Sequence, residues 1–295
     1  MNMLALVVRG LFHWGFSVRI VTESAGAHCY PYPPPSTLIG ALAYGVSNVR
    51  GDPECRLSTN SKNTTIVSNA ILIADVVHWA TFAFSDEGSI MRRSAAVSYS
   101  DFIRAFRLLY QRVQRHTWNQ SEMWYGVNAH GKVYACGAGF KIFYLIDEER
   151  FRSLGLDDRG LLTAAYSIVR IGAREGLVSV TSAEVSRDVK IFSAKEAKGP
   201  FETEYYFPAR LVEDVEGAET VHLPKLERRI WEFRPERPFA LHDHEEYYVP
   251  SSLGVVLRPR KMRVNRLAEK GSLVVASFSN GVSEKVVTPL EVVRL

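Results

Sequence analysis

The stretch Tyr30–Gly45, YPYPPPSTLIGALAYG, sets the approach to the first helix and decides the fold around it. Its four prolines fix φ and hold the chain extended before an apolar stripe begins. We predict a helix that is capped by Ser36 after Pro35 and ends near Asn48. The amides of Ser36 and Thr37 at this helix start, with the helix dipole, favour an anion. The alternative is a stiff turn that binds nothing. The apolar stripe consists of Leu38, Ile39, Leu42 and Val46.

Strand patterns lie on both sides of this helix. Residues 4–20 alternate apolar and polar side chains, which predicts one long strand with one buried face and one partly wet face. Gly10 and Gly15 are natural places for a bend or bulge in it. A second strand is predicted around residues 65–84, where the apolar run 70–77 is dense enough to be central in a sheet.

The pattern then repeats with a strand, a helix and a strand. We predict a third strand over 132–146, a helix over 157–171 with Asp157 or Asp158 near its cap, and a fourth strand at Leu177–Val180. The order strand, helix, strand, strand, helix, strand is that of a ferredoxin-like βαββαβ domain, an α+β fold that RRM domains share. RRM domains bind single-stranded RNA on an open sheet face, although the layout alone hosts many unrelated functions.

Two regions fall outside that pattern. Residues 85–130 form a predicted insertion, within which Asp101–His116 reads as an amphipathic helix with Arg104, Arg107 and two further arginines on one face. Residues 186–295 change to short strands and turns, with a hairpin signal at Asn280-Gly281. We therefore predict a first domain over residues 1–185 and a smaller β-rich domain over residues 186–295.

Composition excludes several classes of protein. The chain of 295 residues has a net charge of +4 and an ordinary apolar content, so it is neither wholly disordered nor strongly basic. Three separated cysteines predict no disulfide framework and no zinc site. The stretch LHDHEE (241–246) holds His242 and His244 but lacks a third ligand at a suitable spacing, so no metal is expected. No signal peptide, membrane span or cofactor motif is recognised, which predicts a cytoplasmic protein without cofactor or membrane partner.

A glycine loop follows the second helix in the sequence RIGAREGLVSV (170–180). Gly172 and Gly176 allow close approach of the backbone to a ligand, and the flanking Arg170 and Arg174 suit phosphate contacts. The alternative is a glycine-terminated helix followed by a tight turn.

Basic residues also cluster in the insertion and near the C-terminus. Arg92, Arg93 and the arginine face of 101–116 suit a phosphate backbone, and so does the segment 258–270. A solvated helix face is the alternative for the first cluster. Metal-independent RNA cleavage would need a general base and a cation, for which Tyr44 with Arg115 and His116 is the candidate set.

Two of these stretches, YPYPPPSTLIGALAYG and LLTAAYSIVRIGAREGLVSV (161–180), resemble the CRISPR-associated Cas-five (Cas5) family of RAMP proteins, most closely its archaeal type I-A branch. The likeness covers about residues 1–185 and extends only loosely to the C-terminal part. It implies a ferredoxin-like domain with an inserted thumb, here about 85–130, and a smaller C-terminal domain. Carried onto this chain, the thumb holds Met91, Arg92 and Arg93, an apolar wedge beside two phosphate-binding arginines.

The resemblance also implies partners. Members of the family cap the 5′ handle of the CRISPR RNA in a Cascade complex, next to Cas-seven backbone subunits and the large and small subunits, and meet target DNA only indirectly.

A type I-C branch cleaves precursor RNA with a tyrosine, a lysine and a histidine. This chain has Tyr44 and His116, but Arg115 stands where lysine is expected, and arginine cannot act as a general base. We therefore expect a non-catalytic RNA-binding subunit. The alternatives are a processing endoribonuclease and a generic RRM-like RNA binder.

Overall fold

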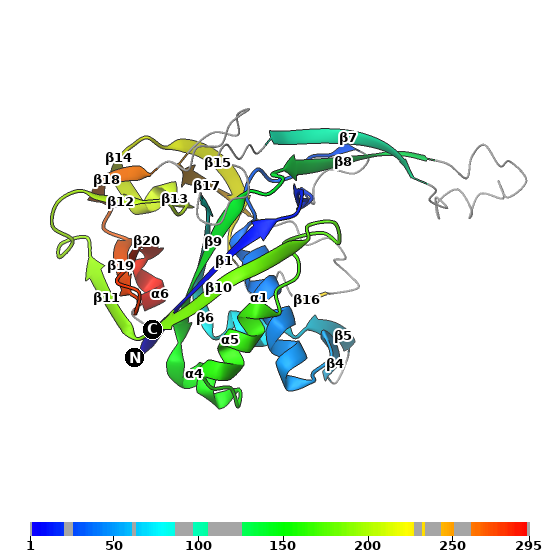
Figure 1. Ribbon diagram of the computed structural model, residues 1–295, viewed down its shortest axis with the longest axis horizontal. Helices are drawn as coiled ribbons and strands as arrows, with labels where there is room; N and C mark the ends of the chain where they lie inside the picture. The colour runs from blue at the N-terminus through cyan, green and yellow to red at the C-terminus, as the bar shows by residue number, and fades with distance from the viewer. Residues whose placement is uncertain are drawn as a thin grey trace, which may run out of the picture.

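The computed structural model describes residues 2–20, 26–60, 63–85, 97–105, 126–226, 232–233, 243–250 and 261–293. Its centre is a four-stranded sheet in which every neighbouring pair is antiparallel, in the order β10-β1-β9-β6 (Figure 1). The strands are β1 (Met3–Phe12), β6 (Val77–Ser85), β9 (Gly139–Asp147) and β10 (Val178–Ser186). Helix α1 (Pro35–Arg50) lies between β1 and β6 in sequence, and α5 (Asp158–Tyr166) between β9 and β10. This is the strand order of a split βαβ arrangement, so the predicted topology is confirmed.

The first strand is shorter than predicted but bends where the sequence indicated. The pairing of β1 with β10 shifts register between Arg9 and Gly10. A Cβ at Gly10 would lie 2.6 Å from both the Phe140 ring and the Ser179 carbonyl oxygen, so only glycine fits there. The chain then turns and continues as β2 (Gly15–Phe16) in another sheet.

Strands β1 and β9 of the central sheet are buried on both faces, which contradicts the predicted partly wet face of the first strand. On one face the hydroxyl of Tyr144 donates to the carbonyl oxygen of Leu38 in α1 at 2.8 Å. On the other face the guanidinium of Arg9 pairs with Glu184 at 2.7 Å and with Glu284 of the C-terminal part at 3.1 Å. The polar positions of β1 are therefore covered by protein, and their charges are paired within it.

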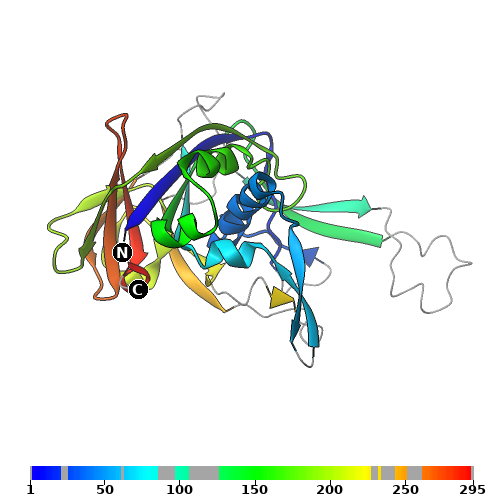
Figure 2. The ribbon, with the colours of Figure 1, turned by 90° about the horizontal axis from the view of Figure 1, so that it is seen from below.

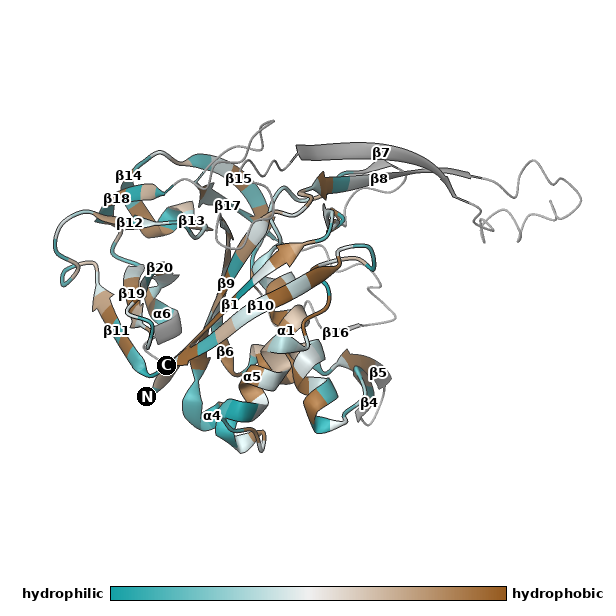
Figure 3. Cartoon of the chain, viewed as in Figure 1, coloured by the Kyte–Doolittle hydropathy of each residue, from teal (hydrophilic) through white to brown (hydrophobic). Residues whose placement is uncertain are grey.

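Hydrophobic residues concentrate in the central sheet and in the helix surfaces that face it, whereas α4 (Glu148–Ser153) at the periphery is largely hydrophilic (Figure 3). One core joins the central sheet to parts of the C-terminal region, including Tyr205, Tyr206 and Val286. A second, smaller core lies wholly within the C-terminal region around Phe207, Met262 and Val264.

Three predicted elements differ from the structure. The apolar run 70–77 forms a short helix, α2 (Ala70–Ala74), and not a central strand; β6 begins after it. The strand predicted over 132–146 is divided into β8 (Gly126–Tyr134) and β9 by a turn at residues 135–138. The helix predicted over 157–171 is capped by the Asp157 carboxylate, as expected, but ends at Tyr166.

Within the predicted insertion, a strand covers the start of the segment 101–116 that was predicted to be helical. β7 (Val97–Ala105) pairs antiparallel with β8, so residues 101–105 are extended and Arg104 lies opposite Val127. The pairing with β8 is a long-range contact that the local helical pattern could not reveal. The rest of the predicted helix, residues 106–116, lies outside the described residues. The β7–β8 hairpin extends away from the main body (Figure 1).

The region after residue 186 is rich in strands, as predicted. A tight turn at Asn280-Gly281 joins two of them, with Gly281 at φ 79° and the Asn280 side chain accepting from the amide of Val282. Three small sheets have the strand orders β11-β19-β20, β12-β18-β14 and β13-β17-β15. Their strands are β11 (Asp188–Ser193), β12 (Phe201–Thr203), β13 (Phe207–Pro208), β14 (Val212–Glu216), β15 (Glu219–Pro224), β17 (His244–Val249), β18 (Met262–Leu267), β19 (Gly271–Ser277) and β20 (Ser283–Pro289).

A hairpin of β4 (Cys55–Asn60) and β5 (Asn63–Ser68) follows α1 and projects from the body (Figure 2). The two-residue strand β16 (Glu232–Phe233) pairs with β5. The remaining short elements are β3 (Gly26–Ala27), the 3-10 turn Ala209–Leu211 and α6 (Leu290–Val293). Within the described ranges, every helix is too short or too polar to cross a lipid bilayer.

Candidate functional site

The start of α1 differs from the prediction in its cap. Pro34 is the N-cap residue and Pro35 the first helical residue, so Ser36 lies inside the first turn and makes no capping hydrogen bond. Proline suits this first position because its φ is already helical and it has no amide hydrogen to satisfy. The amide of Thr37 donates to the carbonyl oxygen of Pro34 at 2.9 Å. That amide is therefore engaged within the helix start.

The glycine loop folds back on itself after α5. The amide of Ile171 donates to the carbonyl oxygen of Gly176 at 2.8 Å, which closes the loop. Gly172 has a φ of 81°, and a Cβ there would lie 2.5 Å from the carbonyl oxygen of Ser17. A Cβ at Gly176 would lie 2.1 Å from the carbonyl oxygen of Ile171. The glycines thus permit close backbone approach, as predicted, but the backbone that they approach belongs to this chain.

Arg170 and Arg174 occupy different environments in that loop. Arg174 is exposed, in the turn between the two glycines. Arg170 is half-buried, and its guanidinium carbon lies 5.6 Å from the ring centroid of Tyr44 on α1. A cation held over an aromatic face leaves its N–H groups directed outward at the edge of the guanidinium plane. The contact therefore orients Arg170 and leaves its donors available.

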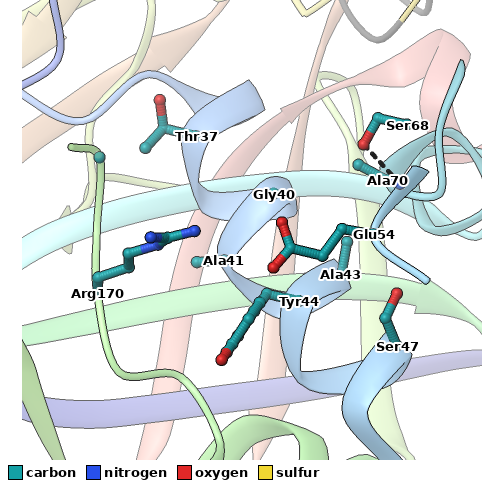
Figure 4. A pocket seen from close by; sticks show the side chains of 11 residues that line it. Thr37, Gly40, Ala41, Ala43, Tyr44, Ser47, Glu54, Ser68, Ala70 and Arg170 are labelled. Carbon is teal, nitrogen blue, oxygen red and sulfur yellow. Dashed lines mark hydrogen bonds between the residues drawn. The ribbon is translucent and has the colours of Figure 1, made fainter. Parts of the chain in front are cut away.

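A pocket of about 310 Å³ lies between α1 and the glycine loop. Thr37, Gly40 and Tyr44 of α1 line one part of it, and Arg170 and Gly172 another. The segment after α1 and the end of β5 complete the lining with Glu54 and Ser68 (Figure 4). Four positions predicted from two distant stretches, Thr37, Tyr44, Arg170 and Gly172, thus meet at one concave surface.

Glu54 is the charged lining residue that the sequence analysis missed. It follows the end of α1, where Gly51 adopts a φ of 71° and the amide of Asp52 returns to the carbonyl oxygen of Ser47 at 2.9 Å. The amide of Asn69 then donates to the carbonyl oxygen of Glu54 at 2.9 Å and fixes its position. The helix-ending glycine was visible in the sequence, but the contact with residue 69 was not.

The other predicted site residues do not join this pocket in the described part of the chain. Ser36 lies in the first turn of α1 but outside the lining, and Arg174 and Gly176 belong to the glycine loop without lining the pocket. Arg104 lies on β7. Met91, Arg92, Arg93, Arg107, Arg115 and His116 lie outside the described residues.

The metal and cysteine predictions concern other parts of the molecule. His244 of the LHDHEE stretch hydrogen-bonds the Tyr30 hydroxyl at 2.6 Å, and Glu245 accepts from Arg210 at 2.7 Å. No cluster of three potential metal ligands occurs among the described residues. All three cysteines are free, and burial raises the pKa of the Cys29 thiol to about 11, so this thiol stays protonated at neutral pH.

Comparison with known proteins identifies relatives across most of the chain. The CRISPR-associated protein Cas5 2 of Saccharolobus solfataricus is 29% identical over 229 residues, 75% of this chain and 74% of the relative. Two further proteins of that organism are each 30% identical: CRISPR-associated protein Cas5 3 over 66% of this chain and 68% of the relative, and CRISPR system aCascade subunit Cas5 1 over the same shares.

A solved structure supports the fold independently. The crystal structure of a CRISPR protein from Archaeoglobus fulgidus superposes with a TM-score of 0.53 at 16% identity, covering 97% of this chain and 99% of that one. No protein-family profile matches the chain. The relatives at 30% identity nevertheless extend over more than two thirds of their own length, and the sequence resemblance to Cas5 proteins is confirmed. The chain therefore belongs to the Cas5 family of CRISPR-associated proteins.

Proposed function

We propose that this chain is a non-catalytic CRISPR RNA-binding subunit of a type I interference complex, most like the archaeal type I-A form. In this role it caps the 5′ handle of the CRISPR RNA, abuts Cas-seven backbone subunits and the large and small subunits, and meets target DNA indirectly. We further assign residues 1–185 to a ferredoxin-like RAMP domain with a thumb at about 85–130, and residues 186–295 to a β-rich C-terminal domain.

The observation that carries this proposal is the meeting of α1 and the glycine loop at one pocket. Arg170 lines that pocket, and its guanidinium lies over the ring of Tyr44. It has no carboxylate partner in the described part of the chain. Arginine donors in a concave site suit a phosphate group. Family membership supports the identity of the ligand, because three relatives are CRISPR-associated Cas5 proteins.

The burial of the sheet argues against a generic RRM-like binder. RRM domains stack bases on an exposed sheet. Here the face that carries Arg9 and Lys141 lies under the C-terminal region, where Lys141 pairs with Glu204 at 3.0 Å. RNA that binds this chain must therefore use another surface, and the pocket beside α1 supplies one.

The lining of the pocket also favours binding over cleavage. Among the described residues that line it there is neither histidine nor lysine, and arginine is not a general base. A metal-independent ribonuclease needs a base for the 2′-hydroxyl and an acid for the leaving oxygen. Tyr44 is the member of the alternative catalytic set that lies at the pocket.

Two assays test the proposal. Labelled repeat RNA incubated with the full chain in EDTA should remain intact while it is bound in a salt-sensitive manner, and backbone subunits should co-purify. A discrete cleavage product that disappears in Tyr44→Phe or His116→Ala would establish the endoribonuclease instead.

For the thumb, Arg92→Ala or Arg93→Ala should weaken handle binding and lower the slope of log affinity against log salt by about one unit each. An unchanged slope would contradict the thumb assignment.

A further inference from the structure

Two opposite charges line the pocket without pairing with each other. Arg170 and Glu54 come from separate elements and point toward one another across the exposed face of α1 (Figure 4). No ion pair joins them, and neither side chain has a hydrogen-bond or ion-pair partner elsewhere among the described residues. Nearby, Arg50 and Asp52 do pair, at 2.8 Å. The separation of Arg170 from Glu54 therefore leaves room for a group that contacts both.

Each of the two residues is held from its own side of the pocket, Arg170 through its side chain and Glu54 through its backbone. The ring of Tyr44 supports Arg170 at 5.6 Å, and the backbone of residue 170 bridges to Leu177. Glu54 is fixed through its carbonyl oxygen by the amide of Asn69, whose side chain also donates to the carbonyl oxygen of Pro53. Groups positioned before binding lose less conformational entropy when a ligand arrives.

The chemistry of the two ends defines the ligand. A guanidinium offers only donors and suits a phosphate, whereas an ionised carboxylate offers only acceptors and needs a donor such as a hydroxyl or an amine. A volume of about 310 Å³ accommodates a small ligand and not a helix or a duplex. A single nucleotide unit of RNA carries both a phosphate and donors, on its ribose 2′-hydroxyl and on its base edge.

We propose that Arg170 and Glu54 form the two ends of a subsite for one ribonucleotide, in which Arg170 binds the phosphate and Glu54 accepts a hydrogen bond from a donor of the same nucleotide. This inference rests on the proposed RNA-binding function and adds a residue that selects among nucleotides. A carboxylate would otherwise repel an RNA strand, so its presence in a phosphate-binding pocket requires a compensating donor.

Fluorescence anisotropy of the full chain with labelled octamers tests this subsite. The probes are rA8, rC8 and rU8 and their 2′-deoxy counterparts. The variants are Arg170→Ala and Glu54→Gln, with Arg159→Ala on α5 and Glu149→Gln on α4 as matched charge controls that lie outside the pocket lining and the glycine loop. Arg170→Ala should weaken ribose and deoxyribose probes alike by about tenfold, and the two controls should bind as the unmodified chain does.

Glu54→Gln distinguishes the two sources of the donor. If the 2′-hydroxyl donates, the unmodified chain prefers ribose probes by about tenfold, and Glu54→Gln, which leaves only a neutral acceptor, reduces that preference for all three sequences. If a base amine donates, the chain prefers rA8 and rC8 over rU8, and the substitution removes that preference in both sugars. Either loss of selectivity supports the subsite.

Two results would overturn the subsite alone. Uniformly tighter binding by Glu54→Gln would mean that the carboxylate only repels phosphate, and unchanged binding by both pocket variants would place the RNA elsewhere. Absence of binding to every probe by the unmodified chain would instead contradict the RNA-binding function itself, and the subsite with it.

Discussion

The hydroxyl of Tyr206 donates a hydrogen bond of 2.7 Å to the carbonyl oxygen of Pro33. Both residues are buried, and the bond joins the C-terminal region to the proline run that precedes α1. Tyr32 packs edge-on against the Tyr206 ring with centroids 6.1 Å apart. A proline run has carbonyl groups but no amide hydrogens of its own, so its carbonyls need donors from elsewhere when buried. The approach to the helix is therefore rigid and also fastened to the C-terminal region.

Tyr206→Phe should destabilise the protein by about 1–3 kcal/mol, because the Pro33 carbonyl loses its donor in a buried site. Urea unfolding measures the change in the free energy of unfolding. Tyr44→Phe is the matched control, since no hydrogen bond of its hydroxyl is observed in the described part of the chain, and it should change stability by less than about 0.5 kcal/mol. Equal effects of the two substitutions would show that the Tyr206–Pro33 bond does not stabilise the fold.

Gly172→Ala should destabilise the chain more than Gly199→Ala. Both glycines have positive φ, 81° and 75°, so alanine costs about 1–2 kcal/mol of backbone strain at either. Only at Gly172 would the new Cβ also meet another backbone, 2.5 Å from the carbonyl oxygen of Ser17; at Gly199 nothing lies within 4 Å. Thermal unfolding of the two variants compares them directly. Equal losses would mean that the close approach to Ser17 contributes nothing.

The acid dependence of stability should reflect Arg187. Its hydrogen bonds lower the pKa of Glu148, with help from Arg152, and also lower the pKa of Asp158. A lowered folded-state pKa gives stability that is present above the unfolded values of about 4 and is lost as the pH falls through the folded ones. Arg187→Met should therefore cost stability at pH 7 and cost less at pH 3.

The cost at pH 7 should be about 1 kcal/mol or less per pair, because Arg187 and Asp158 are both solvent-exposed. Arg159→Met, next to Asp158 on α5, serves as the control, and its effect on stability should not depend on pH in this way. Urea unfolding at the two pH values measures the difference. A cost for Arg187→Met that is the same at pH 3 and pH 7 would exclude the ion pairs as its source.

The topology could be predicted because its signals are local. Alternation in residues 4–20, the Asp157 cap and the helix stripe after Pro35 each report on their own segment. The errors arose where long-range contacts decide. Arg9 looked solvent-facing, yet Glu284 covers it from more than 270 positions away in sequence. A short apolar run such as 70–77 fits a buried strand or a helix equally well, since periodicity cannot separate them.

The candidate site was predictable in its two stretches but not in its assembly. Tyr44 and Arg170 were each noted, for different reasons, and their contact at 5.6 Å follows from the packing of α1 beside α5. Glu54 carried no motif, because its place depends on the turn after α1 and on the amide of Asn69. The Ser36 cap failed since Pro35 already satisfies the first helical position.

Gly40 allows stability and ligand binding to be separated. It lies within α1, lines the pocket, and a Cβ there meets nothing within 4 Å, so the methyl group of alanine would enter the pocket. Gly40→Ala should stabilise the helix by about 0.5–1 kcal/mol and raise Tm, since glycine is a poor helix former. The same methyl group narrows the space between Arg170 and Glu54, so RNA affinity should fall.

Asn48→Ala, at an exposed position of the same helix outside the pocket lining, should stabilise α1 slightly without changing affinity. Thermal unfolding and anisotropy with rA8, measured on the same preparations, give both quantities. A more stable Gly40→Ala that binds RNA as tightly as the unmodified chain would remove this pocket from the RNA-binding surface.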